Sequence, residues 1–381
     1  MSKRKVALLV FLGVFILIGV FYVSNFAKRS KIPLIKTGEI QTATVIDAKK
    51  APRSTTLATN LEVPWALVFL PASPAGGPDK SILFTERIGR VRLIDKNGAL
   101  QEFPIATIND VKQSGEGGLL GIVLHPNFTN NHFIYLYYTY GASGDETLNR
   151  VVRLRFENNI LSGKTIIVDK IPGAPNHNGG RIKFGPDGFL YIATGDAQNP
   201  SLSQNKNSKA GKILRVTDEG KIPADNPFGN EVYSYGHRNP QGLTWDENDI
   251  LWETEHGNST LDELNIIEKG KNYGWPIIQG NQASVGMETP IVNSGSDTWA
   301  PSGAAFLNNS IFFGGLRGQA LFEYNIENKK FTAHLKGELG RIREVVLGPD
   351  NLLYITTSNR DGRGIPDTTD DKIIRINPAK L

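Results

Sequence analysis

One pattern of apolar and polar positions repeats six times along the chain. Each copy has an apolar strand, a turn such as Gly-Pro-Asp-Gly, a β-rich strand, and a further strand that ends in basic and apolar residues. A few short strands per repeat are typical of one blade of a β-propeller, and several such blades close a ring. The copies occupy residues 66–95, 119–156, 180–216, 241–267, 303–326 and 343–377.

Each copy also carries one large apolar anchor residue. The anchors are mostly separated by roughly 55 to 60 residues and the last two by about 40. A two-sheet sandwich also contains many short strands, but it does not predict a six-fold repeat. Few stretches outside the N-terminus keep a helical period, so we expect an all-β, six-bladed β-propeller with little helix. The six anchors are Phe69, Leu124, Phe184, Trp245, Phe306 and Leu347.

The N-terminus carries an unbroken apolar run of 18 residues, 6–23, with three basic residues before it and three more by residue 31. This length is at the threshold for a membrane-spanning helix. A cleaved signal peptide usually has a shorter apolar core and small residues at its cleavage site, and residues 24–27 (Ser-Asn-Phe-Ala) form a poor site. The pattern therefore favours a transmembrane anchor over a signal segment.

We accordingly expect a membrane anchor or signal segment at residues 1–29, a linker at 30–58 with room for one strand, and the propeller domain at 59–381. Both interpretations of the N-terminus direct the chain to the membrane. The expected location is extracytoplasmic, anchored to the cell membrane, or secreted if the segment is cleaved.

The charge balance changes when the N-terminus is set aside. The formal charge is +4, but the first 31 residues hold six Lys or Arg and no acid, which leaves 36 basic against 38 acidic residues, or −2. A nucleic-acid partner is therefore not expected. The chain has no cysteine, which excludes disulfides, thiolate metal sites and cysteine nucleophiles.

Two polar loops enter strands and could carry chemistry. His177 lies between a Pro/Gly loop and a strand, with Gly179 and Gly180 after it, so backbone and ligand can approach closely there. A single histidine is more often structural than catalytic, but this setting makes His177 a candidate general base. The segment 236–242 (Gly-His-Arg-Asn-Pro-Gln-Gly) is a similar loop.

Arginines from three repeats form a second group of candidates. Arg341 and Arg343 are two residues apart and share one strand face, and Arg238 and Arg317 lie in glycine-containing loops. Because arginine suits planar recognition of carboxylates, the four could converge on a polyanion. The alternative is that they are surface residues in weak ion pairs.

Residues 255–263 offer oxygen ligands of the kind that calcium takes, although their spacing is not that of an EF-hand. The alternative is a solvated loop. The sequence contains no Walker loop, no Rossmann fingerprint in its required setting, and no Gly-x-Ser-x-Gly elbow.

Taken together, the motifs resemble the glucose/sorbosone dehydrogenases that use pyrroloquinoline quinone (PQQ), the soluble aldose sugar dehydrogenases. The similarity runs from about residue 60 to 378, and the ordered set is more specific than any single piece. The pieces are 117–121 (Gly-Gly-Leu-Leu-Gly) with 125–126 (His-Pro), 177–181 (His-Asn-Gly-Gly-Arg), 236–242, 262–265 (Asp-Glu-Leu-Asn) and 272–276 (Asn-Tyr-Gly-Trp-Pro).

The resemblance implies that PQQ and calcium are the cofactors, bound at the mouth of the propeller channel. It implies that His177 is the general base, that Arg238 lies against the quinone, and that Asn239 binds the cofactor. The same resemblance assigns the cofactor carboxylates to Arg317, Arg341 and Arg343. It gives main-chain oxygens of Gly257 and Asn258 to an active-site calcium, and Glu263 and Tyr273 to a structural calcium.

The sequence departs from the family at five positions. Glu116 stands for a glutamine in the substrate pocket, Asn176 for the acid that often precedes the base, and Ala197 for a further glutamine. Arg317 stands for a lysine, and Asn258 for a proline at the calcium loop. The departures leave the cofactor site largely intact and put the sugar preference in doubt.

The expected reaction is oxidation of an aldose at C1 to the lactone, with electrons passed to an external acceptor. PQQ carries three carboxylates, which clustered arginines would bind, and a neutral histidine can take the anomeric proton. Two alternatives stay open from the sequence: a calcium-dependent lactonase-type hydrolase, and an extracytoplasmic binding module with a degenerate site. The four arginines argue against the hydrolase, and the departures at Glu116, Asn176 and Ala197 favour the binding module.

Overall fold

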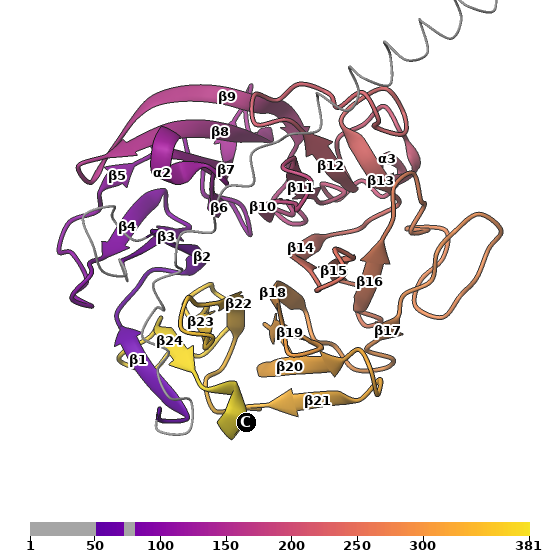
Figure 1. Cartoon of the computed structure of the whole chain (residues 1–381). Coiled ribbons are helices and arrows are strands. Elements are labelled where there is room, and N and C mark those ends of the chain that lie inside the picture. Colours follow the sequence, from indigo (N-terminus) through magenta and orange to yellow (C-terminus); the bar gives the residue numbers. More distant parts are fainter. Residues whose placement is uncertain (1–50, 72–80) are drawn as a thin grey trace, which may run out of the picture. The chain divides into compact units, whose positions relative to one another are not determined.

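The computed structural model describes residues 51–71 and 81–381. This part of the chain forms six four-stranded antiparallel sheets that follow one another around a common centre, as Figure 1 shows. The prediction of a six-bladed β-propeller is confirmed. All six sheets belong to the compact unit that spans Ala43–Leu381.

The first three blades follow the chain from the innermost strand outward. The first has β2 (Pro64–Phe69), β3 (Ile82–Glu86), β4 (Arg90–Ile94) and β5 (Ala106–Thr107). The second has β6 (Leu119–Leu124), β7 (Phe133–Gly141), β8 (Thr147–Glu157) and β9 (Ile160–Pro172). The third has β10 (Ile182–Phe184), β11 (Leu190–Thr194), β12 (Lys212–Val216) and β13 (Val232–Tyr235).

The remaining blades have the same order, except at the outer edge of the sixth. The fourth has β14 (Pro240–Trp245), β15 (Leu251–Glu255), β16 (Glu263–Ile267) and β17 (Val292–Asn293). The fifth has β18 (Pro301–Leu307), β19 (Ser310–Gly315), β20 (Ala320–Asn325) and β21 (Phe331–His334). The sixth has β22 (Ile342–Leu347), β23 (Leu353–Thr357), β24 (Ile373–Ile376) and β1 (Ser54–Ala58).

The sixth blade closes the ring by joining the two ends of the domain. Strand β1 pairs antiparallel with β24, with Ser54 opposite Ile376. Residues 54–58 lie in the segment 30–58, which was expected to be a linker with room for one strand. The strand was hard to assign because it is an edge strand with only one neighbour and carries no continuous apolar run.

Helices are few and short in the part of the chain that the structure describes. They are α2 (Phe128–Asn131), α3 (Ser201–Gln204) and a 3₁₀ turn, η1 (Pro378–Lys380). No helix within residues 51–71 and 81–381 is long and apolar enough to cross a membrane. The expected anchor at residues 1–29 lies outside the described residues.

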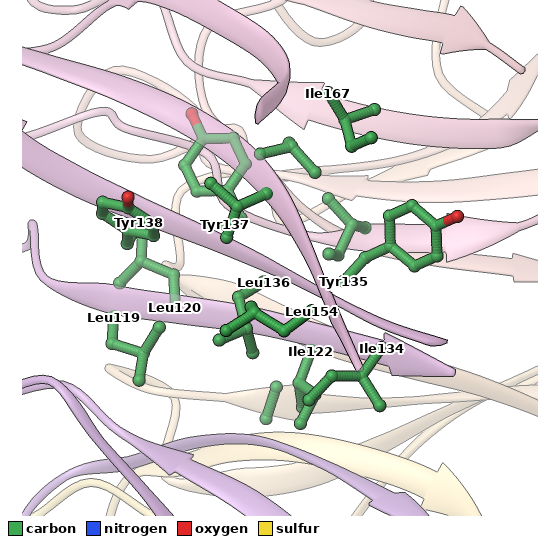
Figure 2. Close-up of a cluster of buried hydrophobic side chains, with 14 of the residues drawn as sticks. Leu119, Leu120, Ile122, Ile134, Tyr135, Leu136, Tyr137, Tyr138, Leu154 and Ile167 are labelled. Atoms are coloured by element: carbon green, nitrogen blue, oxygen red, sulfur yellow. The ribbon is translucent and has the colours of Figure 1, made fainter. Parts of the chain in front are cut away.

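The largest buried cluster fills the space between the first three blades, and Figure 2 shows part of it. Three tyrosines of β7, Tyr135, Tyr137 and Tyr138, are completely buried. The Tyr137 hydroxyl donates a hydrogen bond to the carbonyl of Asn178 (2.8 Å), directly beside His177. Burying a large side chain contributes about 1.5–3 kcal/mol, and the hydroxyl bond ties this core to the loop before β10.

Candidate functional site

A cavity of about 310 Å³ lies where the loops that precede several innermost strands meet. Eight of the residues predicted from the sequence line this cavity. They are Glu116, Asn176, His177, Arg238, Gly257, Asn258, Arg317 and Arg341. The structure thus brings together residues that are up to 225 positions apart in the sequence (116 to 341).

His177 is held in one tautomer by a carboxylate. Its Nδ1 lies 2.8 Å from Oδ1 of Asp196, and Oδ2 of Asp196 accepts a hydrogen bond from the Trp275 indole (2.9 Å). Because a carboxylate only accepts, Nδ1 donates to Asp196, and in the neutral form of the ring the lone pair is on Nε2. His177 has a left-handed backbone (φ 60°). Gly195 lies against the carbonyl of His177. A Cβ at position 195 would collide with that oxygen, which explains why a glycine precedes Asp196.

Glu116 connects the base to a residue that the sequence analysis missed, Arg363. One carboxylate oxygen of Glu116 accepts the His177 amide (3.1 Å), and the other forms an ion pair with Arg363. Arg363 also donates to Oδ1 of Asn176 (2.8 Å). Burial opposes ionisation of Glu116, but His256 and Arg363 lower its pKa to about 2, so the carboxylate is charged.

Arg238 also lines the cavity. Its guanidinium donates to the carbonyls of His256 (3.4 Å) and Asn258 (3.3 Å), and it lies 5.3 Å from the Trp275 ring centroid. Burial lowers the pKa of Arg238, and the surrounding carboxylates oppose this shift. Asn239, the next residue, is fully buried, and its Oδ1 accepts the amide of Gly179 (3.0 Å).

Several buried polar atoms around this cavity have no hydrogen-bond partner within the described residues. They are Nε of Arg238, Nδ2 of Asn239 and Nε2 of His256. An unsatisfied buried donor costs about 1–3 kcal/mol, so such groups mark a place that is built for a ligand. Burial lowers the pKa of His256 to about 4, which keeps its imidazole neutral.

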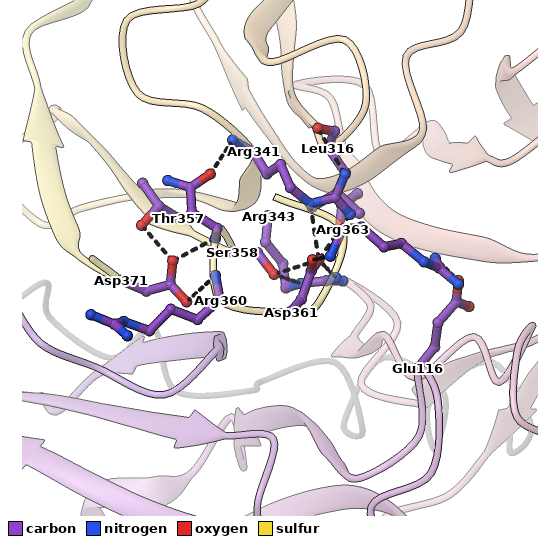
Figure 3. A network of polar contacts seen from close by, with 12 residues as sticks. Glu116, Leu316, Arg341, Arg343, Thr357, Ser358, Arg360, Asp361, Arg363 and Asp371 are labelled. Carbon is purple, nitrogen blue, oxygen red and sulfur yellow. Dashed lines mark hydrogen bonds and ion pairs between the residues drawn. The ribbon is translucent and has the colours of Figure 1, made fainter. Parts of the chain in front are cut away.

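Arg341 and Arg343 share one strand face, as their spacing predicts, and both reach Asp361 (Figure 3). Arg341 donates twice to Oδ2 of Asp361 (3.0 and 2.8 Å), and Nη2 of Arg343 lies 3.6 Å from the same oxygen. Burial opposes ionisation of Asp361, but the two guanidinium groups lower its pKa. Arg317 is exposed at the rim of the cavity.

The loop with the predicted calcium carbonyls is organised by Asp262. One carboxylate oxygen of Asp262 accepts the Gly257 amide (2.8 Å), and the other accepts the amides of Trp299 (2.6 Å) and Ala300 (2.8 Å). These bonds fix the loop so that Gly257 and Asn258 line the cavity. The carbonyl of Asn258 faces Arg238, as the hydrogen bond between them shows.

Glu263 lies outside this cavity, in a cluster of buried acids on β15 and β16. It is opposite Glu255 in the sheet, and Glu253 is opposite Asn265. Burial and mutual repulsion raise the pKa values of Glu253, Glu255 and Glu263. Ligand atoms of His237, Glu253 and Glu255 lie within 4.8 Å of one another.

Two oxygens of this cluster, Oε1 of Glu253 and Oδ1 of Asn265, are buried without a partner in the described part of the chain. Oxygen-only donors with excess negative charge fit a calcium ion. The Tyr273 hydroxyl donates to the carbonyl of Ile266 (2.6 Å), and its ring stacks on His237, with centroids 4.7 Å apart.

The sequence analysis missed Asp196, Asp361 and Arg363. Asp196 follows a strand after a glycine, and residues 359–364 (Asn-Arg-Asp-Gly-Arg-Gly) form a charged, glycine-containing loop after β23. Both belong to polar, glycine-containing segments next to a strand, the same pattern that identified His177 as a candidate. Their partners could not be identified, because these lie 18 to 247 residues away in the sequence.

Comparisons with known proteins agree with this geometry. The profile of the family described as glucose/sorbosone dehydrogenase matches residues 61–373. The aldose sugar dehydrogenase YliI of Escherichia coli is 33% identical over 343 residues, covering 80% of this chain and 90% of that protein. The quinoprotein glucose dehydrogenase B of Acinetobacter calcoaceticus is 34% identical over 256 residues, covering 58% of this chain and 52% of that protein.

Among solved structures, the PQQ-bound aldose sugar dehydrogenase of Streptomyces coelicolor is 37% identical to this chain, with a TM-score of 0.77. The match covers 85% of this chain and 98% of that one. A profile match across most of the chain and relatives at this identity, together with the six-bladed fold, establish that the chain belongs to the glucose/sorbosone dehydrogenase family.

Proposed function

We propose that this protein oxidises an aldose at C1 to the corresponding lactone, with PQQ and calcium as cofactors and His177 as the general base. The observation that carries the proposal is the pair of His177 and Asp196: Asp196 holds Nδ1, which leaves Nε2 for a substrate in a cavity lined by arginines. The family membership and the PQQ-bound relative support the choice of cofactor.

The residues around the cavity fit a polyanionic planar cofactor. Arg341 and Arg343 converge on one carboxylate oxygen of Asp361, and this arrangement supports the proposal that they bind the cofactor's carboxylates. Asn239 and Arg238 would contact PQQ through the unpartnered Nδ2 and Nε. When bound, PQQ supplies a quinone that accepts the hydride from the sugar, and calcium polarises that quinone.

The chain's own groups supply the acid–base chemistry. His177 takes the proton of the C1 hydroxyl on Nε2, and Asp196 then stabilises the imidazolium through Nδ1. The hydrogen bond from Trp275 to Asp196 holds this carboxylate in place. Arg238 lies between Trp275 and the carbonyls of His256 and Asn258 and limits access of water from that side.

Calcium would occupy two places. The carbonyls of Gly257 and Asn258 would hold the ion of the cavity, and Glu263, Glu253 and Asn265 would hold a structural ion. The structural ion would neutralise the buried acids on β15 and β16. We further propose that the enzyme works outside the cytoplasm, held at the membrane by residues 1–29, and passes electrons to an external acceptor.

The departures from the family pattern do not leave a degenerate pocket. Glu116 and Asn176 are joined by Arg363, so the three residues form one polar wall beside His177. Ala197 is followed by Gln198, whose side-chain oxygen accepts the amide of Asn176 (3.1 Å). This ordered wall favours an enzyme over a binding module without a working site.

The test is a titration of the cofactor-free protein with PQQ in the presence of calcium, followed by dye reduction with a panel of aldoses. We expect saturable PQQ binding and dye reduction that requires PQQ, calcium and sugar together. Binding of PQQ without turnover of any aldose would contradict the enzymatic part, and absence of PQQ binding would contradict the whole proposal.

A further inference from the structure

A second cavity, of about 460 Å³, opens at the far end of the central channel. All six innermost strands run from the site described above toward this cavity. It is lined mainly by the C-terminal parts of these strands and, in the third blade, by residues 181–183 at the start of β10. Its walls include five of the six repeated anchor residues. They are Phe69, Leu124, Trp245, Phe306 and Leu347. The proposed sugar oxidation uses none of them.

The deep part of this cavity is charged. Arg181, Lys183 and Glu344 contribute to its lining. Arg181 is 6% exposed, forms an ion pair with Glu344, and donates through Nε to the carbonyl of Gln241 (2.9 Å). Its remaining nitrogen, Nη2, is buried and has no partner within the described residues.

Lys183 is the second cation. Its Nζ donates to the carbonyl of Leu243 (3.2 Å), and it forms no ion pair with any residue in ranges 51–71 and 81–381. Burial lowers the pKa of Lys183 to about 8, since its charge is only weakly compensated. Two cations and one carboxylate, Glu344, leave an excess of one positive charge in the cavity (2 − 1 = +1).

The cavity has an apolar mouth and an uncompensated cation, so it complements a small molecule with an apolar part and an anionic head group. Ligand cavities are typically about 300–1,000 Å³ with apolar walls and a few convergent polar groups, and this cavity fits that description. A doubly charged head group, such as a phosphate monoester, would bring more negative charge than the cavity can neutralise. A carboxylate carries a single charge and accepts two hydrogen bonds.

We propose that this cavity binds an amphipathic monocarboxylate, with its head group between Lys183 and Nη2 of Arg181 and its alkyl chain among Phe69, Trp245, Phe306 and Leu347. Leu347 is 37% exposed, so an alkyl chain that covers it removes apolar surface from water. The binding is independent of the sugar site, because the two cavities share no lining residue.

The probe is octanoate, titrated calorimetrically into the cofactor-free protein, with butyrate, hexanoate and 1-octanol as comparisons. We expect one octanoate per chain, about fourfold tighter binding for each added methylene, and at least tenfold weaker binding of the alcohol. Saturable binding that is equally tight for octanol would overturn the assignment of a carboxylate, and no saturation by octanoate would overturn the site.

Variants locate the site. Lys183→Met keeps the length of the side chain and removes the charge, and it should weaken octanoate binding at least tenfold. Leu347→Ser should weaken octanoate more than butyrate, because it shortens the apolar wall. Lys336→Met, at an exposed lysine away from the cavity, is the matched control and should bind like the unmodified protein.

If Lys183→Met fails to fold, as judged by thermal unfolding, Lys183→Gln replaces it with the same expectation. Equal octanoate affinity in the Lys183 variant and the control would place the binding elsewhere and overturn the proposal. Attachment to zwitterionic lipid vesicles that survives Lys183→Met, without octanoate binding, would identify this face as a lipid-contacting surface instead. Neither result depends on PQQ, so these experiments test the cavity independently of the proposed sugar oxidation.

Discussion

Arg363 forms an ion pair with Glu116 across the mouth of the channel, although the two residues are 247 positions apart (Figure 3). Arg363 belongs to the loop between β23 and β24, and Glu116 belongs to the loop before β6. The pair therefore joins the sixth blade to the second. Because Glu116 also accepts the amide of His177, the pair positions the backbone of the proposed base.

We expect Arg363→Ala to raise the KM for the sugar and to leave PQQ affinity unchanged. Glu116 and Asn176 would lose their common donor and become mobile on the substrate side, whereas the cofactor arginines would keep their contacts. The cost in unfolding free energy should be at most about 1 kcal/mol, because Arg363 is 53% exposed and solvent screens the pair. Steady-state kinetics and PQQ titration measure the two effects.

The control for Arg363 is Arg155→Ala, which removes a similarly exposed arginine that pairs with Glu157 on β8. It should change neither KM nor PQQ affinity. Arg363→Lys should have a KM between those of Arg363→Ala and the native protein, since lysine cannot contact Glu116 and Asn176 with a rigid fork. A KM in Arg363→Ala equal to that of the control would show that the pair has no role in substrate binding.

We expect His177→Gln to lower kcat by about 10²–10⁴-fold while PQQ still binds. Glutamine keeps a polar group at this position but cannot take the C1 proton. The measurement is single-turnover reduction of bound PQQ by sugar. His125→Gln is the control, because His125 lies in the turn after β6, beside Asn131 and Asp218. Near-native turnover in His177→Gln would assign the base to another group.

Arg341→Ala and Arg343→Ala should each weaken PQQ binding by about 1.5–3 kcal/mol, the scale of a charge-assisted hydrogen bond. Both guanidinium groups reach the same carboxylate oxygen of Asp361, so we expect their effects to be non-additive in the double variant. Absorbance titration with PQQ gives the affinities. Equal PQQ affinity in both single variants and the native protein would show that Arg341 and Arg343 are only structural partners of Asp361.

The calcium-free protein should lose stability as pH rises from about 4.5 to about 8. Burial, with repulsion from neighbouring acids, raises the pKa values of Glu255 and Glu263 from 4.5 to about 8 in the folded state. An acid whose pKa is raised on folding releases protons more readily when unfolded, so deprotonation favours the unfolded chain. Thermal unfolding at several pH values in the presence of a chelator measures this loss.

Calcium should therefore raise Tm more at pH 8 than at pH 5, because it binds the ionised carboxylates. Glu263→Gln should reduce the calcium-dependent gain in Tm. Glu338→Gln, at an exposed glutamate paired with Arg53, serves as the control and should keep the full gain. A calcium-dependent shift in Tm that is the same at both pH values and in both variants would show that calcium does not bind at this cluster.

A truncated chain that begins at Thr59 should be less stable than one that begins at Ala51. The shorter chain lacks β1, so β24 becomes an exposed edge and the contact of the Asn377 amide with the carbonyl of Ala51 (3.1 Å) is lost. Chemical denaturation of both chains measures the difference. Equal midpoints would mean that the ring closes without its outermost strand.

The sequence alone was sufficient for the number of blades, and it identified eight of the residues that line the candidate cavity. The period of the anchor residues depends on local patterning, because each blade repeats the same alternation of apolar strands and turns. The loops around His177, Arg238 and Gly257 could be identified as candidates because polar, glycine-containing segments stand directly before strands. Strand β1 was not assigned to the domain, because an edge strand stabilised by a partner at the other end of the chain has little local signal.

Only the tertiary structure determined which side chains meet. Asp196 orients His177, Arg363 joins Glu116 to Asn176, and Asp361 gathers Arg341 and Arg343, and each contact depends on how the loops of different blades converge. The sequence separates these partners by 18 to 247 residues, and no local pattern encodes a pairing over such a distance. The ring of blades determines it, because packing one blade against the next fixes where every loop reaches the channel.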